Sequence, residues 1–398
     1  MRAEDSMSMK STLIAVMAML LAGSPAVAAP APARAASGTI TRLALPAPTG
    51  PERVGTVSLH LVDRSRADPW VATEPARELM VQVWYPARDV RGYPRADWVS
   101  PGVAAVVNPP GSGLDLPVTH GHTGAPAASG RRPVLLYSPG FGLERTASTA
   151  LVEDLASRGF VVVTIDHTHD AQLVEFPGGR LATQAIPQPS DPAEADRILA
   201  KVLDVRVADT RFVLDQVAAI GRGRNPDAEG RALPRGLAQA LDLSRVGMLG
   251  HSMGGATAGQ AMLVDRRIRA GLNLDGTVYG SVLSAGLDRP FMLLGAEPEG
   301  AETDETWDQF WARLRGPRYR LQLDGTRHLS FTDFQVLFAQ IRLPAEDLRR
   351  TVGTIDGQRS VAVQRAYVGA FFDRQLRHRG GRLLAGPSAG YPEMRFLP

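Results

Sequence analysis

Arg245-Val246-Gly247-Met248-Leu249-Gly250-His251-Ser252-Met253-Gly254-Gly255-Ala256 is the stretch from which the interpretation of this chain starts. It joins an apolar run to a G-x-S-x-G pattern and then to a run of small residues, an order typical of a strained turn between a buried strand and a helix. Such a turn, the nucleophile elbow, exposes a serine hydroxyl above a parallel sheet. We expect glycine at 250 and 254 because a Cβ at either position would collide with a facing strand or helix. Ser252 is therefore the candidate nucleophile.

Strand and helix patterns alternate on both sides of this turn. Short apolar runs without a period of two are typical of strands buried on both faces of a parallel sheet. Such runs cover residues 134–137, 160–165, 246–249, 270–274, 291–294 and 319–323, and helices are expected at 144–157, 195–220, 255–264, 303–314 and 360–377. Residues 54–61 and 78–86 instead alternate like half-buried strands, which predicts an antiparallel hairpin at one sheet edge. We predict an α/β fold: a mostly parallel central sheet with an antiparallel edge, helices on both faces, and Ser252 at a carboxyl end.

A serine hydroxyl becomes nucleophilic when a base removes its proton and an acid orients that base. The chain order typical of an elbow is serine, then acid, then histidine. Two histidines follow Ser252: His378 lies among arginines on an expected helix, whereas His328 lies in the loop after the last buried strand. That loop is the expected place of the general base. Asp275 and Glu297 each follow a buried strand, and the residues alone leave both open as the acid.

The tetrahedral intermediate of such a reaction needs N–H donors for its oxyanion. One donor is the backbone N–H after the nucleophile, here that of Met253, and the other comes from a loop after an earlier strand. Ser138-Pro139-Gly140-Phe141-Gly142 follows the expected strand 134–137 and precedes a helix. The N–H of Phe141 is therefore the second predicted donor.

These motifs together resemble the platelet-activating-factor acetylhydrolases of the plasma and intracellular type II kind. The resemblance rests on Ser138-Pro139-Gly140-Phe141-Gly142, the helix end at residues 154–160, residues 250–255, Leu274-Asp275 and His328-Leu329-Ser330-Phe331-Thr332-Asp333-Phe334. It runs from about residue 78 to the C-terminal helix. It implies the α/β-hydrolase fold and a serine esterase that removes short or oxidised acyl chains from phospholipids without calcium or another cofactor. It also implies the residue roles: Ser252 as nucleophile, Asp275 as acid, His328 as base, and Phe141 and Met253 as oxyanion donors.

Secreted bacterial lipases related to cutinases share much of this core and place their acid one strand later, near Glu297. The chain departs from the acetylhydrolases at Pro139, where they usually carry histidine, and in residues 98–131, a Pro-, Gly- and Ala-rich stretch with the pattern of a long loop. A cutinase-like lipase or polyester hydrolase is therefore the alternative enzyme. A binding protein without catalysis on the same fold is the alternative of another class. For the enzymes, the expected partner is a small acyl ester or a lipid.

Composition excludes several classes of function. The chain has 398 residues, a formal net charge of +3 and no cysteine, which excludes disulfides, thiolate chemistry, cysteine zinc sites and a lipoprotein anchor. Its arginines occur in small groups that alternate with acids, without the interleaved aromatics of a nucleic-acid track. Residues 13–22 form an apolar run, and Ala26-Val27-Ala28 is a cleavage pattern of secretory signals. We expect a signal peptide and flexible mature start in residues 1–36, one catalytic domain in residues 37–398, secretion, and no stable membrane anchor.

Two further expectations concern the surroundings of Ser252. His167, His169 and Asp170 follow the expected strand 160–165, but this spacing is a weak metal signal, and we assign the loop to the pocket rim or to hydrogen bonding. His120 and His122, in a glycine-rich loop, are weaker candidates still, so no metal is expected. Residues 276–290 are interrupted by glycines and have no helix-length apolar period, so we expect no cap domain between the strands on either side.

Overall fold

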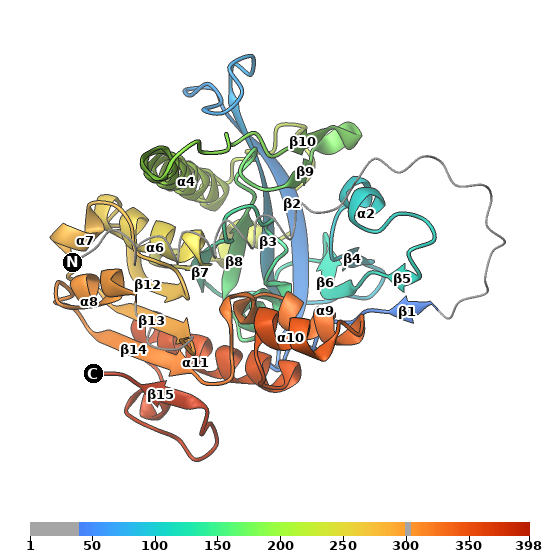
Figure 1. Ribbon diagram of the computed structural model, residues 1–398. Coiled ribbons are helices and arrows are strands. Elements are labelled where there is room, and N and C mark those ends of the chain that lie inside the picture. Colours follow the sequence, from blue (N-terminus) through green and yellow to red (C-terminus); the bar gives the residue numbers. More distant parts are fainter. Residues whose placement is uncertain (1–39, 299–303) are drawn as a thin grey trace, which may run out of the picture. The chain divides into compact units, whose positions relative to one another are not determined.

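A large mixed sheet forms the centre of the chain (Figure 1). The computed structural model describes residues 40–298 and 304–398, so the expected signal peptide lies outside the described residues. The sheet's eleven strands, in spatial order, are β15 (Met394–Phe396), β14 (Arg318–Leu323), β13 (Phe291–Ala296), β12 (Ile268–Leu274), β11 (Leu241–His251), β7 (Arg132–Ser138), β8 (Val161–Ile165), β3 (Arg77–Ala87), β2 (Arg53–Asp63), β6 (Val118–Thr123) and β4 (Arg95–Asp97). From β14 to β8 all neighbours pair in parallel, while β15 and β3 pair antiparallel at the two ends of this block. The predicted mostly parallel architecture is confirmed.

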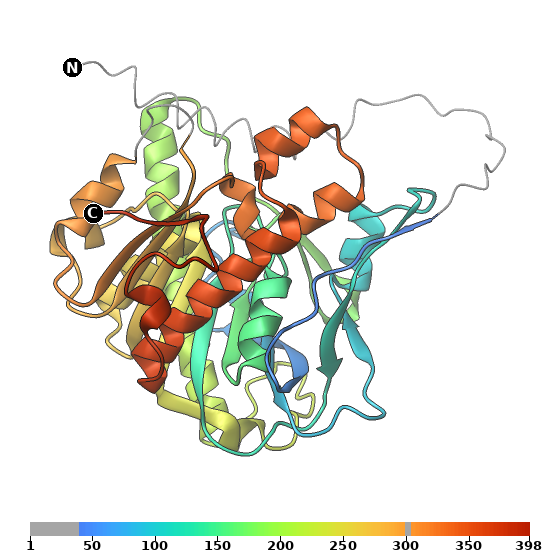
Figure 2. The ribbon, with the colours of Figure 1, turned by 90° about the horizontal axis from the view of Figure 1, so that it is seen from below.

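Helices cover both faces of the sheet, as its apolar strands require. Strand β7 shows why: Val134 and Leu136 pack in one core with α4 (Pro192–Gly221) and α6 (Met253–Val264). Leu135 and Tyr137, on the opposite face, pack with α3 (Thr149–Ser157) and α11 (Gly357–Arg377), which lie over the face of the sheet seen in Figure 2.

The remaining elements are β1 (Thr41–Arg42), α2 (Pro101–Val107), β5 (Leu114–Asp115), β9 (Leu173–Glu175), η1 (Pro177–Gly179), β10 (Leu181–Thr183), α5 (Leu237–Ala240), α7 (Val282–Ala285), α8 (Glu305–Trp311), η2 (His328–Phe331), α9 (Phe334–Gln340), α10 (Ala345–Val352) and η3 (Arg382–Leu384).

The structure corrects two details of the expected order. The hairpin of β2 and β3 forms in antiparallel register, but β6 and β4 extend the sheet beyond it, so the hairpin is not the edge. Residues 98–131, expected as a loop, contain α2, β5 and β6. Strand β6 escapes detection because it is short and polar, with Gly121 where a Cβ would lie 2.6 Å from the Trp84 ring. None of the described helices combines the length and apolar character needed to cross a bilayer.

Candidate active site

Ser252 lies in the turn between β11 and α6, at the carboxyl end of β11. Its backbone has φ 54° and ψ −124°, a sparsely populated conformation that costs a serine about 1–3 kcal/mol. The turn is tight: a Cβ on Gly250 would lie 2.3 Å from the main chain of Gly254, and one on Gly254 would lie 1.9 Å from the oxygen of Ser138. The predicted crowding at both glycines is confirmed, and the strained turn that exposes the serine depends on it.

Asp275 and His328 come together although they are far apart in the chain. Asp275 directly follows β12, also with positive φ (55°), and its Oδ2 lies 2.7 Å from Nδ1 of His328 at the start of η2. Its Oδ1 accepts the N–H of Ala296 at 2.7 Å. Burial raises the pKa of Asp275, but the hydrogen bonds and charge of His328 and the bond from Ala296 outweigh it and leave the pKa below its usual value. Since an ionised carboxylate only accepts, Nδ1 carries the ring proton and Nε2 is left to act as a base.

Glu297, the other candidate acid, makes different contacts. Its Oε2 accepts the N–H of Gly325 at 2.8 Å, and its main-chain oxygen accepts from Arg327 at 3.2 Å. Glu297 thus supports the turn that leads to His328, while Asp275 contacts the imidazole itself. His378, set aside from the sequence, is exposed at the end of α11.

The two expected oxyanion donors belong to segments that touch. The steric contact of Gly254 with Ser138 and Pro139 places the loop Ser138-Pro139-Gly140-Phe141-Gly142, here called the oxyanion loop, against the first turn of α6. Within the described parts of the chain, neither the N–H of Phe141 nor that of Met253 donates to any protein atom. Unpartnered backbone N–H groups at such a turn are suited to binding an anionic oxygen.

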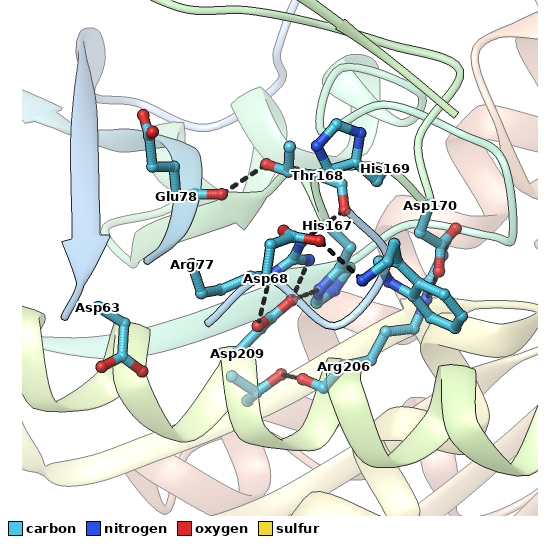
Figure 3. Close-up of polar contacts among 12 residues, drawn as sticks. Asp63, Asp68, Arg77, Glu78, His167, Thr168, His169, Asp170, Arg206 and Asp209 are labelled. Atoms are coloured by element: carbon cyan, nitrogen blue, oxygen red, sulfur yellow. Dashed lines mark hydrogen bonds and ion pairs between the residues drawn. The ribbon is translucent and has the colours of Figure 1, made fainter. Parts of the chain in front are cut away.

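A buried ionic network under the oxyanion loop is the feature that sequence reasoning missed. Figure 3 shows Arg206 and Asp209 reaching from α4 toward Asp170 and His167. Arg206 is fully buried, as are Asp209 and His167. A signal existed: Arg206 follows Val202 by four residues and Leu203 by three, so it falls on the buried stripe of its helix. A charged residue on such a stripe must find partners inside the protein.

His167, His169 and Asp170 have separate partners. His167 Nε2 lies 2.9 Å from Ser138 Oγ, and His169 Nδ1 lies 2.8 Å from the oxygen of Thr183. The loop therefore has the expected hydrogen-bonding role. His167 and Asp170 perform it in the protein interior, because both are buried, and not at the rim of a pocket. His169 approaches Glu74 and Asp68 closely enough for a metal, but Asp68 already pairs with the buried Arg77 at 2.7 Å.

Comparisons with known proteins show the family to which this chain belongs. Residues 45–379 match the family described as platelet-activating factor acetylhydrolase, isoform II. A probable 1-alkyl-2-acetylglycerophosphocholine esterase of Arthroderma benhamiae is 30% identical over 91% of this chain and 96% of its own length. The platelet-activating factor acetylhydrolase of Cavia porcellus is 24% identical over 53% of this chain and 50% of its own. The solved structure of a ferulic acid esterase from Streptomyces cinnamoneus superimposes with a TM-score of 0.76 and 38% identity, covering 89% of this chain and 99% of that one.

The fold and these likenesses define the protein as an α/β-hydrolase that cleaves carboxylic acyl esters. More narrowly, the chain belongs to the family of platelet-activating factor acetylhydrolase, isoform II. The resemblance drawn from the sequence motifs is confirmed.

Proposed function

We propose that Ser252, His328 and Asp275 form the catalytic triad of this esterase, with Phe141 and Met253 as oxyanion donors. The observation that carries the proposal is the 2.7 Å contact between His328 Nδ1 and Asp275 Oδ2. This contact sets the imidazole tautomer in which Nε2 accepts a proton, the state that a general base requires. The elbow serine is tied to the same strand end, because the N–H of Ser252 donates to the oxygen of Leu274, the residue before Asp275, at 2.8 Å.

The reaction proceeds through an acyl-enzyme. Oγ of Ser252 attacks the ester carbonyl carbon while its proton passes to Nε2 of His328, and the carbonyl oxygen becomes an oxyanion that accepts from the N–H groups of Phe141 and Met253. The C–O bond to the alcohol then breaks, and His328 returns the proton to the departing oxygen. Water repeats the sequence on the acyl-serine: His328 takes its proton, the acid is released and Oγ regains its hydrogen. Asp275 stays ionised and stabilises the imidazolium that forms in both halves.

Covalent labelling tests these roles directly. A fluorophosphonate should add one phosphonyl group to the wild-type protein, on the peptide that contains Ser252, and abolish hydrolysis of p-nitrophenyl acetate. Ser252→Ala should remain folded, resist labelling and lose several orders of magnitude in kcat. Ser284→Ala, which removes an exposed serine of α7, is the matched control and should behave as wild type. A folded Ser252→Ala protein with near-wild-type activity would contradict the assignment, and so would a wild-type protein that hydrolyses the ester but is not labelled at Ser252.

For the substrate, we infer a short-chain or phospholipid acyl ester. The support is the family and the fungal relative named as an acetylglycerophosphocholine esterase. A second candidate is an ester of an aromatic acid, favoured by the higher identity, 38%, to the ferulic acid esterase. Values of kcat/KM for a 2-acetyl phospholipid, methyl ferulate, a long-chain triacylglycerol and a soluble polyester fragment would separate these. We expect the highest kcat/KM for the phospholipid. The highest value for methyl ferulate would select the second candidate, and the highest value for the polyester would select the cutinase-like alternative.

We also propose that the protein is exported through a signal peptide within residues 1–36. The support is the apolar run of residues 13–22 followed by Ala26-Val27-Ala28. Expression of the full chain in a secreting bacterial host should yield a shortened protein in the culture medium, whose N-terminal sequence gives the cleavage site. Retention of the full-length chain inside the cells would contradict export.

A further inference from the structure

The side chain of Arg206 is fully buried under the oxyanion loop, and all five of its N–H groups have acceptors. Nη1 donates to the oxygen of Pro139 at 2.5 Å and to Ser138 Oγ at 3.3 Å. Nη2 donates to the oxygen of Gly140 at 3.0 Å and to Asp170 Oδ1 at 2.7 Å. Nε donates to Asp170 Oδ2 at 2.6 Å. The guanidinium thus holds two consecutive carbonyl groups of the loop, a task that needs its planar fork of donors.

Asp170 holds the same loop at its other end. Both of its oxygens accept from Arg206, which lies next to it in Figure 3. Its Oδ1 also accepts the N–H of Gly142 at 3.1 Å. Between the carbonyl of Gly140 and the N–H of Gly142, the N–H of Phe141 has no acceptor in the described parts of the chain. Hydrogen bonds therefore hold the backbone groups on both sides of this N–H, while the N–H itself has no acceptor among the described residues.

The direction of that N–H follows from the peptide bond. In a trans peptide unit the C=O and the N–H point in opposite directions. The carbonyl of Gly140 and the N–H of Phe141 belong to the same unit, and Arg206 holds that carbonyl toward α4. The N–H of Phe141 is consequently directed away from α4, on the side opposite the guanidinium.

A second chain of hydrogen bonds runs from α4 to Ser138 at the start of the loop. Asp209, one turn after Arg206, lies with Oδ2 3.0 Å from Nδ1 of His167, whose Nε2 lies 2.9 Å from Ser138 Oγ. Buried ion pairs of this kind are weak evidence for stability, because desolvation offsets much of the attraction. Asp209 also pairs with the buried Arg77, at 2.8 Å, so it does not serve the loop alone. The contacts of Arg206, by contrast, all go to the oxyanion loop and to Asp170.

We propose that Arg206, held by Asp170, is a positioning residue for catalysis: it fixes the Gly140–Phe141 peptide unit so that the N–H of Phe141 faces the oxyanion. This inference rests on the oxyanion role of Phe141 in the proposed function. An oxyanion donor acts mainly in the transition state, so loss of its orientation lowers kcat more than it raises KM.

The test uses Arg206→Lys and the double variant Arg206→Met/Asp170→Asn in the full chain. Lysine keeps the charge but lacks the fork that reaches both carbonyls, and the double variant removes both buried charges so that neither is left unpaired. Both should lower kcat for p-nitrophenyl acetate by about 10²-fold, the scale of one lost oxyanion donor, with KM changed less than about threefold. The affinity of a trifluoromethyl ketone, which forms an oxyanion adduct with the serine, should fall by a similar factor.

The matched control is Arg365→Met. Arg365 of α11 is equally an interior arginine that donates to main-chain oxygens, those of Pro46, Ala47 and Ala150, but it does not touch the oxyanion loop. It should lower the melting temperature while leaving kcat within about threefold of wild type. Wild-type kcat in a folded Arg206→Lys protein, or an equal loss of kcat in Arg365→Met, would overturn the inference. Phosphonate labelling of wild-type Ser252 distinguishes these outcomes from failure of the proposed function itself.

Discussion

The ring of His251 donates from Nε2 to the main-chain oxygen of His328, 2.9 Å away, and the two ring centroids lie 4.5 Å apart. Because a carbonyl only accepts, this bond requires the tautomer with hydrogen on Nε2. Nδ1 of His251 has no hydrogen-bond partner among the described residues, so a second proton there would be buried without an acceptor. Burial, followed by the neighbouring His328, lowers the pKa of His251 to about 3. The residue before the elbow serine therefore supports the general base as a neutral ring.

This buried histidine should make the protein sensitive to acid. The pKa is about 3 when folded and 6.5 when unfolded, so the unfolded state takes up a proton first as the pH falls. The stabilising contribution is complete above about pH 6.5 and is lost progressively toward pH 3. The loss of unfolding free energy from this group between pH 7 and pH 4 should be about 3 kcal/mol. His251→Gln, whose amide can still donate to His328, should flatten the dependence of the free energy of unfolding on pH by that amount.

Urea unfolding of both proteins at pH 7 and pH 4 measures the difference. His378→Gln removes an exposed histidine at the end of α11 and is the matched control, whose curve should run parallel to that of wild type. Parallel curves for wild type and His251→Gln would mean that the buried ring titrates as it does in the unfolded chain.

The two acids near His328 should differ sharply in their effect on catalysis. Asp275→Asn replaces a carboxylate that contacts Nδ1 of the imidazole and favours the wrong tautomer, so it should cost roughly 10³–10⁴ in kcat. Glu297→Gln changes a side chain that accepts from Gly325 and does not contact the ring, so it should cost far less. Both are measured as kcat on p-nitrophenyl acetate, with circular dichroism to establish folding. The reverse ranking would indicate the acid position of the cutinase-like lipases.

Local patterns in the sequence predict most of the candidate site but do not separate its two candidate acids. The elbow around Ser252, the parallel strands and the position of His328 follow from local patterns, because apolar runs and G-x-S-x-G encode local backbone geometry. The sequence cannot separate Asp275 from Glu297 by residue type, since both follow neighbouring parallel strands. Only the tertiary structure shows which carboxylate meets the imidazole.

The missed features depend on long-range contacts. Strand β6 joins the sheet edge with a polar, glycine-containing sequence, and its place is set by pairing with β2. Arg206 lies on an ordinary amphipathic helix, and its acceptors come from two loops more than thirty residues away. A buried-stripe argument predicts that Arg206 needs partners, but not that those partners are main-chain oxygens of the oxyanion loop.

The last prediction concerns access to the site, which should not require a lipid interface. Residues 276–290 connect β12 to β13, the place where many lipases insert a helical cap, and all of them are described. They contain only the four-residue helix α7, as the glycine-interrupted sequence predicts. A segment of this size is too short to act as a mobile lid over a crevice. Monomeric short-chain esters should therefore be hydrolysed without micelles. Initial rates against concentration, followed across the solubility limit of the ester, should give a smooth hyperbola. A sharp rise where aggregates first form would instead require a lid elsewhere in the chain.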